Sequence, residues 1–279
     1  MEEKLMKDNT KELMAFREHL HCDELSERTQ EIYLLQAKRF LIWLDGRTLT
    51  KQEVMSYKDN IIMKRGKTTT VNLAITALNR YLRFSGHDEC TVHALRVQKP
   101  QCPDNILSAA EYRRMTAYAR ETGQEKYYCI MRTLALTGIR VSELAGCTVE
   151  AIDQGSFEVE NKGKRRNIYL PYKLTGDLRH YCDEAHIDNG VIFRGSHGTP
   201  ISRIAVYKML IRLATKAGVP WEKAHPHSFR HLFAITYMEK YANLSELADI
   251  LGHSSLETTR IYTMTTAEDK RRRMNELDL

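Results

Sequence analysis

Apolar residues in the first 86 positions recur at the spacing of amphipathic helices. The clearest pattern begins near Ser26, where apolar side chains fall at i, i+3, i+4 and i+7 until Gly46. Similar patterns predict helices near 8–22, from Thr50 to Gly66 and from Thr68 to Gly86. The N-terminal part is therefore predicted to be a compact module of four helices.

The helical pattern lapses between residues 87 and 106. Pro100 and Pro103 stand among polar residues there, a composition that suits an extended linker. We therefore expect one domain over residues 1–90 and a second over residues 107–279, joined by this linker.

Beyond the linker the pattern is again mostly helical. A capping box from Ser108 to Glu111 opens one helix, and an apolar helix over about 127–136 ends at Gly138. Four apolar residues alternate around a charged turn, which predicts a short β-hairpin: Phe157, Val159, Ile168 and Leu170. Further helices are predicted near 171–186, 201–217 and 228–241, followed by two short ones. The expected fold class is mainly α with a small antiparallel β-sheet.

Composition narrows the class of protein. No apolar run approaches the ~20 residues of a membrane span, and the charged N-terminus does not resemble a secretory signal. Six scattered cysteines without a C-x-x-C pair argue against a disulfide framework or a thiolate zinc site. We therefore expect a cytoplasmic protein without a membrane partner. A net charge of +6 is compatible with DNA as a partner, although many ordinary enzymes are equally basic.

Two segments of the second part carry paired polar residues. Gly138 is a plausible helix end, and Arg140 and Glu143 follow it one helical turn apart. Alone, this segment is typical of a helix junction with a surface ion pair. Farther on, His227 and Arg230 share one helix face, where both can donate to one anion. The rival interpretation makes zinc ligands of the three histidines, but no standard ligand spacing supports it: His225, His227 and His231.

Two further segments complete the set. Gly252 would end a helix, His253 would lie in the turn, and Tyr262 would fall about two turns into the next helix. Taken alone, this tyrosine is more typical of a packing residue than of a nucleophile. The predicted hairpin turn carries lysines that could either be solvated or reach a bound phosphate.

Together these segments supply two arginines, two histidines, a lysine and a tyrosine. Guanidinium groups clamp phosphate oxygens and stabilise the charge that develops in the transition state. A lysine can protonate a leaving oxygen and a tyrosine can attack phosphorus, provided that cations surround its hydroxyl. This set indicates phosphodiester chemistry that requires neither a metal nor another cofactor.

The order and spacing of these motifs closely resemble those of the tyrosine recombinase (phage integrase) family. The matching stretches are TGIRVSEL at 137–144, NKGKRR at 161–166, HSFRH at 227–231 and LGHSSLETTRIY at 251–262. The resemblance implies a SAM-like core DNA-binding domain before an α+β catalytic domain of the DNA breaking-rejoining type. Because the helical module begins almost at residue 1, we expect an Xer-like member without an arm-binding domain.

The resemblance also assigns a role to each matching residue. Arg140, Arg230, His227 and His253 would bind the scissile phosphate, and His227 would also assist proton transfer. Tyr262 would form a 3′-phosphotyrosyl bond, and Glu143 would order the site. Lys162 would protonate the 5′-oxygen. Because NKGKRR is one residue shorter than the usual turn of the family, Lys164 is an alternative for that role.

The resemblance implies a particular assembly. The partner would be double-stranded DNA with specific recombination sites, bound by a protein that is monomeric in solution and tetrameric in the synaptic complex. A paired recombinase or an accessory protein could take part. The tail over residues 264–279 fits either a segment that is passed to a neighbouring subunit or a solvated basic end.

Two alternatives compete with a site-specific recombinase. A type IB topoisomerase would use similar chemistry to relax supercoils as a monomer. A non-catalytic DNA-binding regulator would have lost one of the catalytic positions, whereas all of them are present here. A site-specific recombinase of this family would serve the integration and excision, the inversion or the resolution of DNA.

Overall fold

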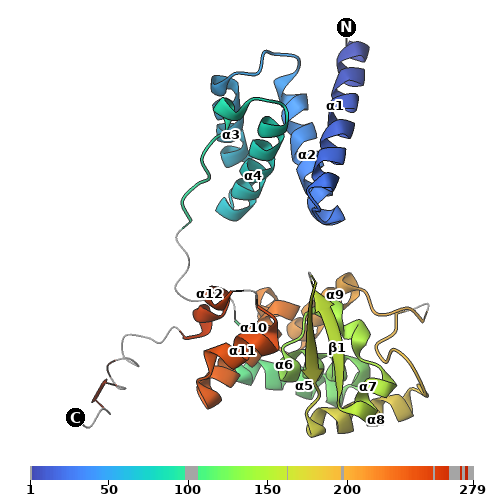
Figure 1. Cartoon of the computed structure of the whole chain (residues 1–279). Helices are drawn as coiled ribbons and strands as arrows, with labels where there is room; N and C mark the ends of the chain where they lie inside the picture. The colour runs from blue at the N-terminus through green and yellow to red at the C-terminus, as the bar shows by residue number, and fades with distance from the viewer. Residues whose placement is uncertain are drawn as a thin grey trace. The chain divides into compact units, whose positions relative to one another are not determined.

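The computed structural model describes residues 2–97, 106–161, 163–195, 198–253, 255–263, 271 and 274–275. The chain divides into two compact units, Met1–Lys99 and Pro100–Leu279 (Figure 1). Among the described residues, none of the helices has the length and apolar character needed to cross a membrane. The mainly helical fold class predicted from the hydrophobic pattern is confirmed.

The first unit consists of four helices and a short 3-10 turn. Their bounds are α1 Glu2–Cys22, α2 Glu27–Leu44, α3 Lys51–Arg65, α4 Thr68–Phe84 and η1 Asp88–Cys90. Ser26 and Thr50 cap α2 and α3 through their side chains, as polar residues before an apolar periodic run commonly do. Phe16, Phe40 and Tyr81 lie in the middle of the shared core.

The second unit contains eight α-helices, three 3-10 turns and a two-stranded sheet among its described residues. Their bounds are α5 Ala109–Glu121, α6 Glu125–Thr137, η2 Val141–Gly146, α7 Val149–Gln154, β1 Ser156–Asn161, β2 Lys164–Tyr169, α8 Tyr172–Glu184, α9 Arg203–Lys216, η3 Trp221–Lys223, α10 Pro226–Tyr241, α11 Leu244–Leu251, α12 Leu256–Thr259 and η4 Arg260–Thr263. The strands pair antiparallel with Phe157 opposite Ile168, which confirms the predicted hairpin.

The core of the second unit forms around α6. This helix packs against α5, α8 and α10, and its inward residues Ile130, Met131 and Leu134 are fully buried. The hairpin contacts α11 through β2 and α7 through β1, and Figure 1 shows α10 and α11 on one side of it and α7 and α8 on the other. This packing brings the C-terminal ends of α6 and α11 close to the N-terminal part of α10.

Two boundaries differ from the sequence-based expectation. The third-last helix, α10, begins at Pro226 and not at residue 228, because the His225 ring accepts a hydrogen bond from the Ser228 amide and so caps the helix early. Tyr262 lies in the 3-10 turn η4 and not two turns into an α-helix. The β-branched pair Thr258 and Thr259 lowers the helix propensity just where α12 ends.

Candidate active site

The end of α6 positions the first candidate residue. Gly138 adopts a left-handed conformation with φ of 62°, and a Cβ atom there would lie 2.5 Å from the ring of Phe233. Glycine is therefore required both by the backbone and by the close approach of α10. The chain then turns, so that Arg140 directly precedes η2 and its amide donates to Glu143 Oε2 at 2.7 Å.

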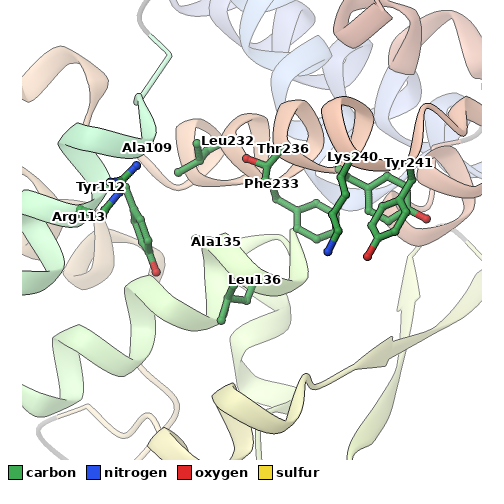
Figure 2. Close-up of a pocket in the computed structure, with 11 residues that line it drawn as sticks. Ala109, Tyr112, Arg113, Ala135, Leu136, Leu232, Phe233, Thr236, Lys240 and Tyr241 are labelled. Carbon is green, nitrogen blue, oxygen red and sulfur yellow. The ribbon is translucent and has the colours of Figure 1, made fainter.

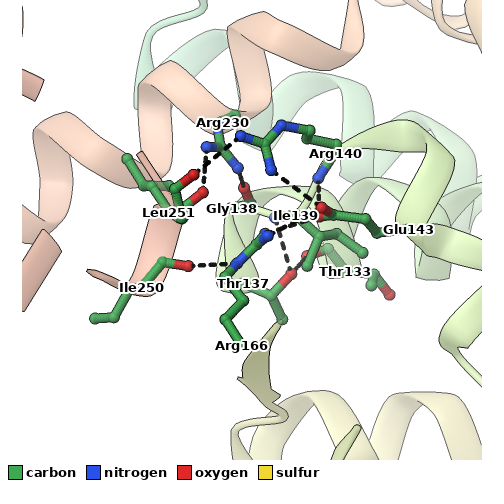
Figure 3. Close-up of polar contacts among 11 residues, drawn as sticks. Thr133, Thr137, Gly138, Ile139, Arg140, Glu143, Arg166, Arg230, Ile250 and Leu251 are labelled. Atoms are coloured by element: carbon green, nitrogen blue, oxygen red, sulfur yellow. Dashed lines mark hydrogen bonds and ion pairs between the residues drawn. The ribbon is translucent and has the colours of Figure 1, made fainter. Parts of the chain in front are cut away.

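The N-terminal part of α10 carries the second arginine into the protein. Arg230 is only 3% exposed, and its Nη1 donates to the carbonyl oxygen of Gly138 at 2.7 Å (Figure 3). Its Nη2 donates to the carbonyl oxygen of Leu251 at 2.6 Å. These carbonyls belong to the ends of two helices, which have unpaired acceptors and a negative dipole end. One guanidinium therefore joins α6, α10 and α11.

Three arginines hold three consecutive carbonyl groups at the end of α11. Arg166 Nε donates to Ile250 O at 3.0 Å, Arg230 to Leu251 O, and Arg140 Nη2 to Gly252 O at 3.3 Å. The turn that presents His253 is therefore tied to β2, α10 and η2. Side chains fixed in this way are preorganised for an anion, since little rearrangement is needed when it binds.

Glu143 is the acidic centre of this network. Its carboxylate is buried and accepts hydrogen bonds from Arg140 Nη1 at 3.1 Å and from Arg166 Nη1 and Nη2 at 3.0 and 2.8 Å (Figure 3). Burial opposes ionisation, but hydrogen bonds from Arg166 and the Arg140 amide outweigh it and hold the pKa of Glu143 below its usual value. These two guanidinium groups and the nearby Arg230 outnumber the one carboxylate, which leaves an excess of positive charge that suits a phosphate.

Arg166 had no assigned role in the sequence interpretation, although it belongs to the NKGKRR stretch. The signal that identifies it is the alternation along β2. Ile168 and Leu170 are 2% and 6% exposed, and Arg166 lies on the same side of the strand. A charged residue on the buried side of a hairpin requires a buried partner, and Glu143 is that partner.

We expect Arg166→Met to lower the free energy of unfolding by about 3 kcal/mol, because it leaves Glu143 and the Ile250 carbonyl short of partners in a buried setting. Urea denaturation measures this loss. The matched control is Arg165→Met, on the exposed face of the same strand with its side chain 69% exposed. That change should cost less than about 0.5 kcal/mol. Equal losses for the two variants would contradict the role given to Arg166.

His253 follows the left-handed Gly252 and is half-buried. Its Nδ1 lies 2.8 Å from Thr259 Oγ1, which joins the turn to the end of α12. Burial and the positive charges of Arg230, Arg140 and Arg166 lower the pKa of His253 to about 4. The ring is therefore neutral near pH 7 and can donate one hydrogen bond.

Tyr262 reaches the same region from η4. Its ring packs on the small apolar cluster of Ala234, Leu247 and Leu251, and its hydroxyl oxygen lies 2.6 Å from Nδ1 of His231. Burial raises the pKa of the Tyr262 phenol, and the nearby Arg230 offsets this only in part. The hydroxyl is therefore protonated near neutral pH before any substrate arrives.

His227 lies on the outer part of the same helix face. Its side chain is exposed. The partial burial of the ring against the protein and the charges of Arg230 and Arg140 lower the pKa of His227. An exposed ring near two arginines is placed to meet a ligand that approaches from solvent. Of the histidines that could have been zinc ligands, His225 caps α10 and His231 contacts Tyr262.

The structure thus brings together Arg140, Glu143, Arg230, His253 and Tyr262, with His227 at the outer edge. Lys162 and the side chain of Lys164 lie outside the described part of the chain. Two contributors, Arg166 and His231, were not identified as site residues from the sequence. The assembled groups can bind a tetrahedral anion beside a tyrosine hydroxyl.

Acidification from about pH 6.5 to about pH 4 should destabilise the protein. Burial and neighbouring charges lower the pKa values of His231 and His253 to about 4, so the unfolded chain binds more protons than the folded one in this window. The lowered pKa of Glu143 adds a loss in the same direction at still lower pH. Urea unfolding of the wild type at several pH values measures how the free energy of unfolding changes with pH.

A His231→Gln, His253→Gln double variant should lose less stability over this pH range than the wild type does. A wild type whose stability rises on acidification, or a double variant with the same slope, would contradict these pKa shifts.

Sequence profiles of known families match both units. Residues 105–269 match the profile described as the Phage integrase family, and residues 13–85 match the one described as Phage integrase, N-terminal SAM-like domain. Among curated proteins, the chain is 27% identical over 277 residues to a tyrosine recombinase XerA of Pyrococcus furiosus. That alignment covers 96% of this chain and 93% of the relative.

Solved structures share the fold. A lambda integrase dimer bound to a COC′ core site aligns with a TM-score of 0.74 and 19% identity, over 91% of this chain and 76% of that one. A XerH site-specific recombinase bound to a difH substrate aligns with a TM-score of 0.71 and 18% identity, over 88% of this chain and 78% of that one.

Proposed function

The chain belongs to the phage integrase family and is a tyrosine-type site-specific DNA recombinase, and from this premise we propose that Tyr262 is its nucleophile. The observation that carries the proposal is the arginine network at the end of α11. It holds Arg140, Arg230 and the His253 turn in one place, beside the Tyr262 hydroxyl.

We propose the following reaction. The Tyr262 oxygen attacks the scissile phosphorus and forms a 3′-phosphotyrosyl bond, while the 5′-oxygen leaves and takes a proton from Lys162 or Lys164. Arg140 and Arg230 stabilise the charge on the non-bridging oxygens, and His227 and His253 donate to them. The phosphotyrosyl bond retains the energy of the broken phosphodiester, so the 5′-hydroxyl of another strand can reverse the reaction without nucleotide hydrolysis.

We assign different roles in the reaction to the two units. We assign binding around the core site to residues 1–90 and catalysis to residues 107–279, in keeping with the two family matches. Two of the structural relatives are bound to DNA sites, which supports specific double-stranded DNA as the partner of this chain. We also place this protein in the cytoplasm, because its proposed substrate is DNA.

Covalent capture tests this function. A binding site is first selected from a random duplex library with the Tyr262→Phe protein, then synthesised with a nick that lets the cut fragment diffuse away. The wild type should form an SDS-stable adduct with the fragment labelled on the 3′-phosphate side, in EDTA and without ATP. An adduct with the other fragment, or none on any selected site, would contradict the proposed reaction.

We propose that four subunits assemble on two sites, and a groove on the second unit supports this. The groove has a volume of about 350 Å³ and lies between α5, α6 and α10. Apolar side chains such as Tyr112, Leu136 and Phe233 line it, with Lys240 at its edge (Figure 2). The segment 264–279 carries apolar Met274, Leu277 and Leu279 among charged residues, so its chemistry suits the groove of a neighbouring subunit.

Two differently labelled DNA sites distinguish a recombinase from a topoisomerase. The wild type should pair them, and removal of residues 264–279 should abolish pairing but not single-site cleavage. Thr236→Arg, which fills the groove, should act in the same way as the truncation. The exposed Glu239→Arg on the same helix, away from the groove lining, should leave pairing unchanged. Supercoil relaxation without any paired complex would favour the topoisomerase instead.

A further inference from the structure

The Tyr262 hydroxyl contacts a histidine that has no role in the reaction described above. The 2.6 Å contact joins its oxygen to Nδ1 of His231, and the two ring centroids lie 5.5 Å apart. His231 follows Arg230 directly and lies one helical turn after His227, so both histidines occupy the same face of α10. Their ring centroids are 6.4 Å apart, with His227 exposed and His231 half-buried. The outer ring can therefore meet DNA while the inner ring meets the nucleophile.

The surroundings of this contact favour a neutral ring beside a protonated hydroxyl. Besides Tyr262, the titratable and charged groups near His231 are His225 at the N-cap of α10, His227 and Arg230 on that helix, and His253 from the turn after α11. Burial and the charges of His227, His225 and Arg230 lower the pKa of His231 to about 4, so the ring is neutral near pH 7. Burial raises the pKa of Tyr262, so its hydroxyl is protonated. A neutral ring with its proton on Nε2 leaves Nδ1 free to accept, and in that tautomer the Tyr262 O–H donates to Nδ1.

We propose that His231 holds the Tyr262 oxygen in position and accepts its proton when that oxygen attacks the phosphorus. This proposal rests on the proposed function, because it requires Tyr262 to be the nucleophile. The bond from phosphorus to the Tyr262 oxygen forms as the O–H bond breaks, and the proton moves to Nδ1. The bond from phosphorus to the 5′-oxygen breaks, and that oxygen takes its proton from the hairpin lysine. In rejoining, His231 returns the proton to the departing Tyr262 oxygen.

A neighbouring base is needed because of where the tyrosine lies. A phenol with a raised pKa contributes very little free phenoxide near pH 7, so direct ionisation would be slow. Transfer to an adjacent neutral imidazole avoids a free phenoxide in a buried site. A bound phosphate also adds negative charge beside the arginines, which raises the proton affinity of His231 when DNA is present. The base would therefore strengthen as the substrate binds.

The decisive variant is His231→Asn, whose side-chain oxygen can still accept a hydrogen bond near the Nδ1 position but cannot take up a proton. Its single-turnover cleavage of the nicked substrate should fall by about 10²-fold or more, the usual contribution of a general base. The cleavage rate of the variant should rise about tenfold for each pH unit between about pH 7 and 9, whereas the rate of the wild type should hardly change with pH over this range. Thermal melting of the variant checks that it folds.

A substrate with sulfur at the 5′-bridging position separates the two proton transfers. A thiolate leaves without protonation because its conjugate acid has a pKa near ~8.5. Lys162→Ala or Lys164→Ala, whichever removes the acid, should therefore be rescued by this substrate. His231→Asn should not be rescued, since this change impairs the removal of the proton from the attacking Tyr262 oxygen. His227→Asn is the matched control on the same helix face: it should cleave slowly but keep the flat pH profile of the wild type.

Two results would overturn the role of His231. One is a wild-type rate and pH profile in His231→Asn, and the other is its rescue by the sulfur substrate, which would place it on the leaving-group side. Failure of the proposed function looks different: the wild type would then form no covalent adduct, or Tyr262→Phe would still form one.

Discussion

Replacing Tyr262 by phenylalanine should abolish covalent attachment to DNA while leaving DNA binding intact. The variant loses the attacking oxygen and its hydrogen bond to His231. It keeps the aromatic ring, which packs on the cluster of Ala234, Leu247 and Leu251, so we expect little change in the free energy of unfolding. Incubation with the nicked substrate and an SDS gel measure attachment, and gel mobility in native buffer measures binding.

The matched control for this change is Tyr207→Phe, which removes the hydroxyl of an exposed tyrosine on α9. That variant should form adduct at the wild-type rate. Adduct formation by the Tyr262→Phe protein would show that another residue attacks the phosphate.

Arg230→Lys is the second change with a large expected effect. Lysine keeps the positive charge, but its single ammonium group cannot reproduce the planar fork that reaches both Gly138 O and Leu251 O. Cleavage should fall by about 10³-fold, at the upper end of the loss seen when one oxyanion donor is removed. The free energy of unfolding should fall by about 1–3 kcal/mol, because a buried carbonyl loses its donor.

Single-turnover cleavage and urea denaturation, measured on the same preparation, separate the two effects of Arg230→Lys. Arg203→Lys, at the exposed start of α9, is the control and should change neither quantity. Near-wild-type cleavage by Arg230→Lys would mean that charge alone, and not the fixed fork, is needed at this position.

Local sequence signals account for much of the fold and for several parts of the site. Gly138 ends α6 and sets the position of Arg140, and the i, i+3 spacing of His227 and Arg230 holds because α10 is a regular helix. The hairpin follows from the alternation of Phe157 and Ile168 with polar neighbours. Each of these features depends on residues that are near one another in the chain, so periodicity and capping suffice to predict it.

Other parts of the site depend on contacts between distant segments. The partner of His231 is Tyr262, 31 positions away in η4. The sequence pattern predicted an α-helix at Tyr262, and the 3-10 turn that forms there places its side chain differently. Arg166 finds Glu143 across 23 positions, and only the strand alternation indicates that it points inward. Sequence spacing alone predicts neither pairing, since one joins β2 to η2 and the other joins α10 to η4.

The central claim, that Tyr262 attacks the phosphate held by Arg140 and Arg230, is tested most directly by locating the covalent bond. The SDS-stable complex is digested with nuclease and protease, and the peptides are sequenced by tandem mass spectrometry. We predict a nucleotide joined through its 3′-phosphate to the tyrosine of the segment TTRIYTM, at position 262. A nucleotide on any other side chain, such as Tyr237 or Tyr241 of α10, would contradict this account of the site.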